Sequence, residues 1–208
     1  MTTISALKGK DFIIIGSDSQ VSLGNIRLPF PYKKIERVGS NLIAGTGSVG
    51  NLQRVLSLAL RDIRINRVAV DNLDLNPCLN ELAKKLAELN FSLPLEHKHY
   101  NPFSFLIGGL DDEENPALVS VGDDGSIINV PTYYADGSGM DFALTTLGQS
   151  YHSDISKEEA GRLIFNSLSQ STKHDIYTNN TPLVVCLSTN GEQWEINDLK
   201  LEEKKECS

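Results

Sequence analysis

The order of the predicted strands and helices is the feature that most constrains the fold of this chain. Runs of apolar and β-branched residues, which are typical of strands, occur in three groups, and two pairs of segments with helical periodicity separate them. This order predicts an α+β protein in which two sheets pack face to face between outer helices, a four-layer αββα sandwich. It argues against a doubly wound nucleotide-binding fold, in which strands and helices alternate strictly. Strands are predicted at 3–7, 11–18, 42–44, 103–110, 117–121, 127–130, 183–187 and 194–196, and helices begin at about 48, 77, 137 and 156.

Two of these helices carry the clearest local signals. The first has a single apolar stripe, because its apolar residues recur three and four positions apart, at Leu52, Val55, Leu56, Ala59, Leu60 and Ile63. The last begins with a capping box formed by Ser156 and Glu159, and Ile155 can pack beside it as a hydrophobic staple. Near the end of the chain, Asn190-Gly191 predicts a β-hairpin.

The composition narrows the possible classes of function. Among 208 residues, 27 are acidic and 19 are basic, which gives a net charge of −8. Sequence-independent binding of nucleic acid needs a basic surface, so we expect no nucleic-acid partner. No apolar run approaches the ~20 residues of a membrane helix, and the first residues lack the pattern of a signal peptide. We therefore expect a cytoplasmic protein without membrane association, with one domain over residues 2–200 and a charged, flexible tail over 201–208.

Neither a metal site nor a cofactor is predicted. The segment 45–50 is rich in glycine, but it lacks the G-x-G-x-x-G spacing of a dinucleotide-binding loop. The cysteines and histidines lack the spacing of a disulfide framework or of a metal site. These residues are Cys78, Cys186, Cys207, His97, His99, His152 and His174.

The N-terminus carries the first candidate for catalysis. Methionine is usually removed when a small residue follows it, so loss of Met1 would leave Thr2 at the start of the chain. A terminal threonine combines a hydroxyl nucleophile with an α-amine, whose ordinary pKa of about 7.7–8.0 allows it to act as a general base. Many unrelated proteins also begin with Met-Thr, so this interpretation depends on residues elsewhere in the chain.

Polar and glycine motifs follow at the ends of the predicted strands, and their order resembles the β-type subunits of the proteasome family, the N-terminal-nucleophile threonine peptidases. The motifs that are similar to the bacterial branch, the HslV peptidase, are Thr2-Thr3-Ile4, Asp18-Ser19-Gln20, Leu23-Gly24-Asn25 and Lys33-Lys34. Those that are more similar to archaeal and eukaryotic 20S β subunits are Gly47-Ser48-Val49-Gly50, Ile107-Gly108-Gly109 and Gly137-Ser138-Gly139. The resemblance covers nearly the whole chain and implies the αββα fold of the N-terminal-nucleophile hydrolases.

The resemblance implies a catalytic role for four of the matching residues. Thr2 matches the nucleophile, Lys34 the lysine beside it, and Asp18 the carboxylate that pairs with this lysine. The backbone N–H of Gly47 matches the donor that stabilises the tetrahedral oxyanion. Taken singly, Lys34 could be a surface lysine and Asp18 a turn residue, so the hypothesis rests on the ordered set.

Three further residues match catalytic-site positions of the family, and the first two of them match the side chains that hold the terminal amine in place. They are Ser138, Asp175 and Thr178, and 20S subunits typically have serine at the last of these positions. Singly, Ser138 could be a helix N-cap and Asp175 an acid near a helix end. Gln20 stands where many 20S subunits have arginine, and the interval from Lys34 to Gly47 is about one residue shorter than in either branch. We expect removal of Met1 alone to expose the nucleophile.

The same alignment predicts a substrate pocket beside the nucleophile. Its walls come from Val21, Tyr32, Gly45 and Val49, with Glu36 near its base. Glycine leaves room for a large side chain, which predicts cleavage after leucine, tyrosine or phenylalanine. A carboxylate at the floor of the pocket would instead favour lysine or arginine.

The resemblance implies a threonine endopeptidase subunit of a self-compartmentalised complex. Its partners would be other β-type subunits in a stacked ring, possible α-type proteasome subunits, and a regulatory ATPase that feeds unfolded proteins. One alternative is a non-catalytic structural β-type subunit. The other is a small-molecule amidase of the same superfamily, although those enzymes more often use cysteine or serine as the nucleophile.

Overall fold

The computed structural model describes residues 2–23, 26–69, 77–96, 102–179, 181–189 and 193–195. Within these ranges the chain forms two five-stranded sheets, a short two-stranded sheet and four helices. Several residues that the sequence analysis singles out lie outside the described ranges: Met1, Gly24, Asn25, His97, His99, Asn190, Gly191, Ile196, Cys207 and the tail 201–208.

Both large sheets are antiparallel. The first has the order β10-β1-β2-β11-β12, and its strands are Tyr133–Gly137, Thr3–Lys8, Phe12–Ser17, Leu183–Ser188 and Gln193–Glu195. The second has the order β5-β6-β7-β8-β9, and its strands are Ile35–Val38, Asn41–Gly47, Phe103–Leu110, Pro116–Val121 and Ile127–Asn129. Between β2 and β5, Ser22–Leu23 (β3) and Ile26–Arg27 (β4) pair as the small sheet.

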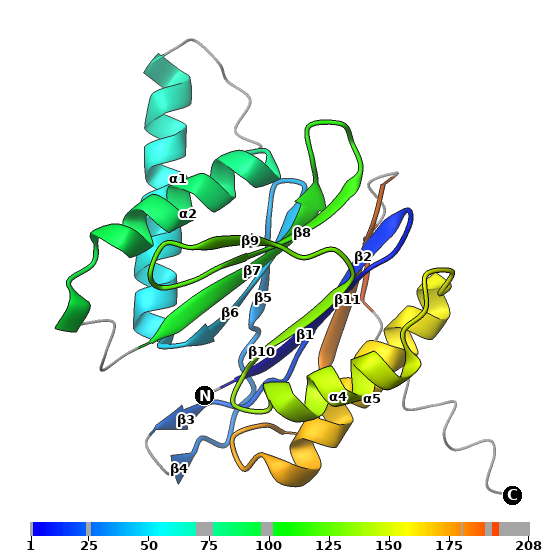
Figure 1. Cartoon of the computed structure of the whole chain (residues 1–208). Coiled ribbons are helices and arrows are strands. Elements are labelled where there is room, and N and C mark those ends of the chain that lie inside the picture. Colours follow the sequence, from blue (N-terminus) through cyan, green and yellow to red (C-terminus); the bar gives the residue numbers. More distant parts are fainter. Residues whose placement is uncertain are drawn as a thin grey trace, which may run out of the picture.

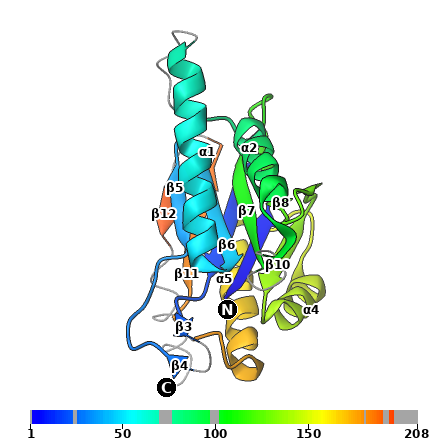
Figure 2. The ribbon, with the colours of Figure 1, turned by 90° about the vertical axis from the view of Figure 1, so that its left-hand side faces the viewer.

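Two helices cover the outer face of each large sheet (Figure 1). Helices α1 (Val49–Ala69) and α2 (Leu79–Ser92) pack on the second sheet, and α4 (Met140–Ser150) and α5 (Lys157–His174) pack on the first. Figure 2 shows α1 extending well beyond the end of the sheets. The predicted four-layer αββα sandwich is therefore confirmed.

Three apolar cores separate the four layers. One lies between α1, α2 and the second sheet, one between α4, α5 and the first sheet, and the third between the two sheets. Strand β2 contributes to two of them, because Ile13 and Ile15 face the core between the sheets while Ile14 faces α4 and α5. Alternate side chains point to opposite faces of a strand, so a strand buried on both faces has to be apolar throughout.

The local signals of the helices agree with the structure. Ser156 Oγ accepts a hydrogen bond from the N–H of Glu159, whose carboxylate accepts one from the N–H of Ser156 at 2.9 Å, so the capping box is formed. Ile155 is buried in the core beneath α5. Cys78 occupies the N-cap of α2, so that helix begins two residues after Pro77.

Two strands that frame the site were not predicted from the sequence. The glycine-rich segment that was expected to open a helix instead ends strand β10, and α4 begins only at Met140, with Gly139 as its N-cap. Strand β5 was also missed. Neither segment alternates clearly between apolar and polar residues, and each is held as a strand by pairing with β1 or β6.

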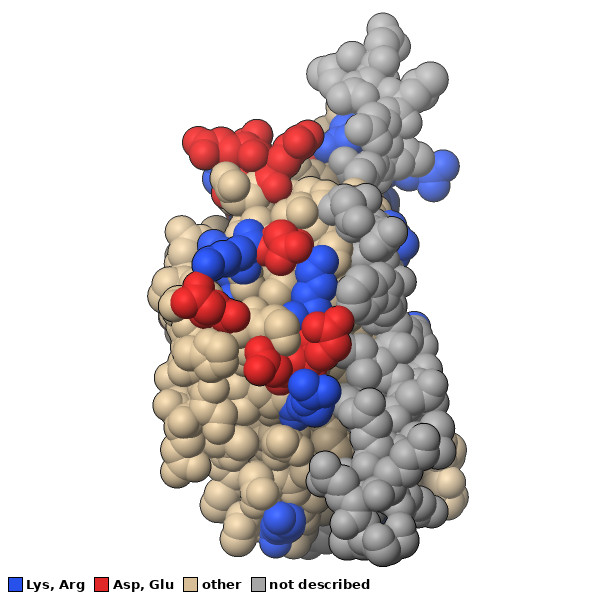
Figure 3. All heavy atoms as spheres, turned by 90° about the vertical axis from the view of Figure 1, so that its right-hand side faces the viewer, with Lys and Arg blue, Asp and Glu red and all other residues tan. Residues whose placement is uncertain are grey.

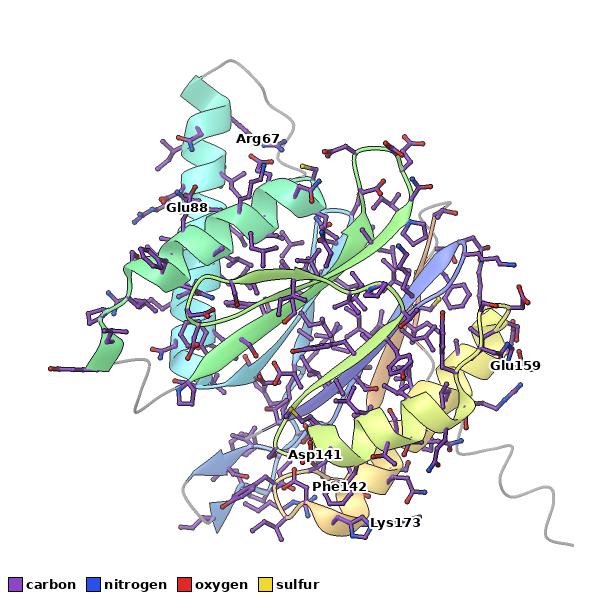
Figure 4. The ribbon with its side chains drawn as sticks, in the orientation of Figure 1. Arg67, Glu88, Asp141, Phe142, Glu159 and Lys173 are labelled. Carbon is purple, nitrogen blue, oxygen red and sulfur yellow. The ribbon has the colours of Figure 1, made fainter. Side chains whose placement is uncertain are left out.

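Ion pairs tie neighbouring elements together at the surface. Figure 4 labels Arg67 of α1, which pairs with Glu81 of α2, and Phe142 at the start of α4, whose ring stacks on His174 at 4.6 Å between ring centres.

On the face seen in Figure 3, acidic and basic side chains lie close together instead of forming a field of one sign. None of the described helices is long and apolar enough to span a membrane.

Candidate active site

Thr2 lies at the end of the sandwich where β1 begins, next to the last residues of β10. Its exposed fraction is 5%, and its carbonyl oxygen accepts a hydrogen bond from the N–H of Ser138 at 3.0 Å. The backbone of Gly137 lies directly against that of Thr2. A Cβ atom at Gly137 would lie 1.7 Å from the carbonyl oxygen of Thr2, and its φ is +95°, so only glycine fits here.

A buried ion pair lies on the other side of β1. Lys34 Nζ donates to Asp18 Oδ1 at 2.8 Å, and the exposed fractions of the two side chains are 5% and 0%. The Asp18 carboxylate also accepts hydrogen bonds from the N–H of Thr3 at 2.9 Å and of Gln20 at 2.8 Å. Burial of this carboxylate is tolerated because each of its oxygens accepts a hydrogen bond.

The environment of Lys34 changes its proton affinity. Burial lowers the pKa of the ammonium, and this effect outweighs the negative charges of Asp18 and Asp175, which raise it. A buried lysine with a lowered pKa and a specific charge partner is a candidate functional residue.

A second polar cluster forms where α5 ends. Asp175 Oδ2 accepts hydrogen bonds from Ser138 Oγ and Thr178 Oγ1, each at 2.6 Å, and Oδ1 accepts one from the N–H of Tyr177 at 3.0 Å. Burial acts to raise the pKa of this carboxyl, but the three hydrogen bonds outweigh it and hold the pKa below the ordinary 3.8. Asp175 therefore contacts both Ser138 and Thr178, the two hydroxyl residues predicted beside it at the site.

Thr3 joins this cluster to β1. Its Oγ1 accepts a hydrogen bond from the N–H of Gly139 at 3.0 Å and lies 2.6 Å from Thr178 Oγ1. Because the hydroxyl hydrogen of Thr178 goes to Asp175, Thr3 is the donor in this pair. Thr3 thus contacts both polar clusters, a role that was not predicted from its sequence position.

Gly47 ends β6 in a conformation reserved for glycine. Its φ is +91°, and a Cβ atom at this position would lie 2.0 Å from the carbonyl oxygen of Pro102. The N–H of the next residue, Ser48, donates to that same oxygen at 3.1 Å before α1 begins. The sharp turn therefore needs glycine for steric reasons, apart from any role of its N–H in catalysis.

One pocket contains the predicted nucleophile, the lysine and three of the four predicted wall residues. Its cavity volume is about 50 Å³, and its lining contains Thr2, Lys34, Tyr32, Gly45 and Val49. The remaining lining residues are Lys33, Glu36, Ile43, Ala44, Leu52, Gln53, Leu56 and Phe105. Val21 was expected in the wall, but it is half-buried outside this lining.

The chain is similar to known proteins over most of its length. The family described as "Proteasome subunit" matches residues 1–187. The chain belongs to the proteasome subunit family. It is 31% identical over 193 residues to proteasome subunit beta 2 of Pyrococcus furiosus, covering 91% of this chain and 88% of that one. It is 28% identical over 202 residues to proteasome subunit beta 1 of Thermococcus kodakarensis, covering 96% and 95%. The resemblance inferred from the motifs is therefore confirmed, as is the N-terminal-nucleophile hydrolase sandwich.

Some residues that shape this proteasome-family site were not found from the sequence. Leu52 was assigned only to the apolar stripe of α1, yet its Cδ2 lies 2.6 Å from where a Cβ of Gly45 would be. Leu52 thus fills the space that glycine leaves, so the room expected at Gly45 for a large substrate side chain is already occupied. No local pattern shows this contact between α1 and β6. Asn179 was not singled out either, and its side-chain oxygen accepts a hydrogen bond from the N–H of Ser19 at 3.1 Å, which holds the turn after Asp18.

No metal centre is found among the residues that the structure describes, because none of them form a group of three or more His, Cys, Asp or Glu side chains suited to a metal ion. Among the histidines in the described ranges, His174 stacks on Phe142. His97 and His99 lie outside the described residues.

We expect Asp175 to make the stability of the protein depend on pH. Its folded pKa lies below 3.8, so its stabilising contribution is complete above that value and is lost as the pH falls through the folded pKa. Asp175→Asn should therefore lower the thermal midpoint near pH 6, and its gap to the wild type should narrow as the pH falls below 3.8 and through the folded pKa. Calorimetry over this range measures the gap. Asp112→Asn, which changes an exposed carboxylate in the β7–β8 loop, serves as the control and should leave the midpoint nearly unchanged. A constant gap for Asp175→Asn would contradict the assignment.

Proposed function

We propose that this proteasome-family subunit is a threonine endopeptidase that becomes active once Thr2 is the first residue. The observation that carries the proposal is the pocket that Thr2 shares with Lys34, whose ammonium forms a buried ion pair with Asp18. Both partners of that pair are costly to bury, and a merely structural subunit gains nothing from keeping a lysine at the pocket wall. This supports catalysis over the non-catalytic alternative.

The chemistry requires one residue to act as both nucleophile and base. Thr2 Oγ attacks the carbonyl carbon of the peptide bond, and its proton passes to the α-amine of Thr2. The oxygen of the tetrahedral intermediate takes the negative charge and accepts a hydrogen bond from the N–H of Gly47. As the C–N bond breaks, the ammonium gives its proton to the leaving nitrogen, and the acyl group stays on Thr2 as an ester.

Hydrolysis of this ester completes the cycle. The free amine of Thr2 takes a proton from water, and the resulting hydroxide attacks the ester carbon. The bond to Oγ breaks, Oγ takes back the proton from the ammonium, and the acid product leaves. In this scheme the positive charge of Lys34 lowers the proton affinity of the Thr2 hydroxyl and amine, and Ser138, Asp175 and Thr178 hold the amine end of the chain.

Membership of the family supports assembly into a multi-subunit proteasome. The relatives in Pyrococcus furiosus and Thermococcus kodakarensis carry the name proteasome subunit beta. We propose that this chain forms a stacked ring with other β-type subunits, with α-type subunits as possible partners, and that an ATPase supplies unfolded polypeptides. A cytoplasmic location stays a prediction from the sequence.

The function is tested by measuring the N-terminus and the activity of the same assembled sample. Intact mass determines whether Met1 is absent, native mass determines the size of the assembly, and a fluorogenic peptide reports hydrolysis. We expect hydrolysis only in samples that begin with Thr2. An assembled protein that begins with Thr2 and cleaves no peptide would favour the structural alternative. Hydrolysis confined to small amides would favour the amidase alternative.

We expect the pocket to select large apolar residues at the P1 position, on the amino side of the cleaved bond. Its walls include Ile43, Leu52, Leu56 and Phe105, and burial of apolar surface rewards an apolar side chain that fits. Leucine, tyrosine and phenylalanine should therefore be cleaved faster than alanine or aspartate. A panel of fluorogenic peptides that differ only at P1 measures the order, and a best substrate with acidic P1 would contradict it.

The carboxylate of Glu36 is the feature of the pocket that would favour basic over apolar P1 residues. Its side chain lines the same pocket, where its carboxylate would attract lysine or arginine and repel acidic side chains. We expect Glu36→Gln to lower kcat/KM for peptides with basic P1 and to leave those with leucine nearly unchanged. If basic P1 residues are the best substrates of the wild type, Glu36 outweighs the apolar walls.

A further inference from the structure

A chain of polar side chains crosses from one sheet to the other beside the candidate site. Asp136 of β10 accepts a hydrogen bond from Ser104 Oγ of β7, and Ser104 Oγ lies 2.7 Å from Thr46 Oγ1 of β6. The exposed fraction of Thr46 is 5%, and the other two residues are half-buried. Hydrogen bonds to an ionised carboxylate are stronger than those between neutral groups, so this link is well suited to hold two sheets in register.

Asp136, at one end of this link, lies on the strand whose last residue contacts Thr2. Asp136 lies opposite Ile4 in the pairing of β10 with β1, and the next pair joins Gly137 to Thr3. The second oxygen of Asp136 accepts a hydrogen bond from the N–H of Gly137 at 2.6 Å. Since Gly137 lies against the carbonyl oxygen of Thr2, Asp136 holds the backbone that touches the nucleophile residue.

Thr46, at the other end of this link, lies on strand β6, which ends at Gly47. Thr46 immediately precedes this glycine, and the β6–β7 register pairs Thr46 with Ser104 and Gly47 with Phe103. A hydrogen bond at Thr46 therefore restricts the last residue of β6, whose N–H is the proposed oxyanion donor.

Two acidic residues, one on each side of β1, thus accept hydrogen bonds from residues of the opposite sheet. On one side Asp18 follows β2 and binds Lys34 at the start of β5, and on the other side Asp136 of β10 reaches β6 through Ser104. We propose that Asp136 is a positioning residue that acts through Ser104 and Thr46 to fix the N–H of Gly47 relative to Thr2. This inference rests on the proposed threonine peptidase function.

The test compares two inhibitors of the assembled protein that share one peptide. The peptide aldehyde reacts with Thr2 Oγ to give a tetrahedral adduct whose oxygen needs the oxyanion donor, and the peptide alcohol fills the pocket without forming this adduct. For Asp136→Ala we expect kcat/KM to fall about tenfold and the inhibition constant of the aldehyde to rise about tenfold, because small misplacements of catalytic groups have large effects. The constant for the alcohol should stay within about twofold.

Conservative and matched variants separate positioning from general stability. Asp136→Asn keeps one acceptor oxygen for the N–H of Gly137, and its NH2 group can donate to Ser104 Oγ in place of the lost acceptor. It should therefore restore most of the aldehyde binding, while Ser104→Ala should reproduce the loss. Asp124→Ala removes a carboxylate that likewise accepts a backbone N–H, from Ser126 at 2.8 Å, in the β8–β9 turn, and should change neither constant. If Asp136→Ala does not assemble, Ser104→Ala decides the question by the same two constants.

Several outcomes would overturn the inference. Equal weakening of aldehyde and alcohol would show a general disturbance of the pocket, and unchanged binding of both would show no positioning role. Unchanged binding of the aldehyde together with weaker binding of the alcohol would overturn the inference as well. The proposed function fails separately, if Thr2→Ala retains hydrolysis. Full activity of Asp136→Ala beside an inactive Thr2→Ala would remove only the role of Asp136.

Discussion

We expect Thr2→Ala to abolish peptide hydrolysis while the assembled particle persists. In the proposed mechanism one residue supplies both the nucleophile and the general base, and alanine removes the hydroxyl that forms the covalent intermediate. Thr2 contributes to the fold mainly through its backbone, because its carbonyl oxygen accepts the hydrogen bond from the N–H of Ser138. Alanine keeps that contact, so native mass should be unchanged and fluorogenic turnover should fall to background.

Thr2→Ser is the matched control for this substitution. Serine keeps the hydroxyl and allows removal of Met1, so turnover should remain measurable. The mature N-terminus of both variants has to be established by intact mass, since an unprocessed chain would be inactive for another reason. Full turnover by a correctly processed Thr2→Ala protein would refute the catalytic assignment of Thr2.

The second large effect is expected at Lys34. Lys34→Ala leaves the carboxylate of Asp18 buried, with an exposed fraction of 0%, and without its cationic partner. Breaking a buried ion pair typically costs about 3–5 kcal/mol of the free energy of unfolding. Activity should fall nearly as far as in Thr2→Ala, because the positive charge beside the nucleophile is lost. Denaturant unfolding and fluorogenic turnover measure the two effects separately.

Lys34→Arg tests whether charge alone is sufficient. The planar guanidinium is larger than an ammonium and cannot take its place in a closed site, so we expect neither activity nor stability to return. Lys10→Ala is the matched control, because Lys10 also pairs with an aspartate, Asp154, at 2.6 Å, but its side chain is 76% exposed. Solvent screens such a pair, so its loss should change little. An active Lys34→Arg enzyme would show that the compact ammonium is not required.

Much of the scaffold could be predicted from short stretches of sequence. The capping box at Ser156, the apolar stripe of α1 and the apolar run of β2 each depend on residues a few positions apart, and each is found in the structure. The order of these elements was sufficient to predict two stacked sheets between helices. The candidate residues themselves were found through their resemblance to a family, since no single one is informative alone.

Contacts between distant segments were decided only by the tertiary structure. Strand β10 exists because β1 offers it an edge, and Leu52 rather than Gly45 shapes the pocket wall because α1 lies across β6. The link from Asp136 to Thr46 joins residues that are far apart in sequence and lie on different sheets. Periodicity and capping are local properties, so both could be predicted from short segments without knowledge of the fold. Which polar groups meet at Thr2 depends instead on how the two sheets are stacked and registered, a result of packing the whole chain.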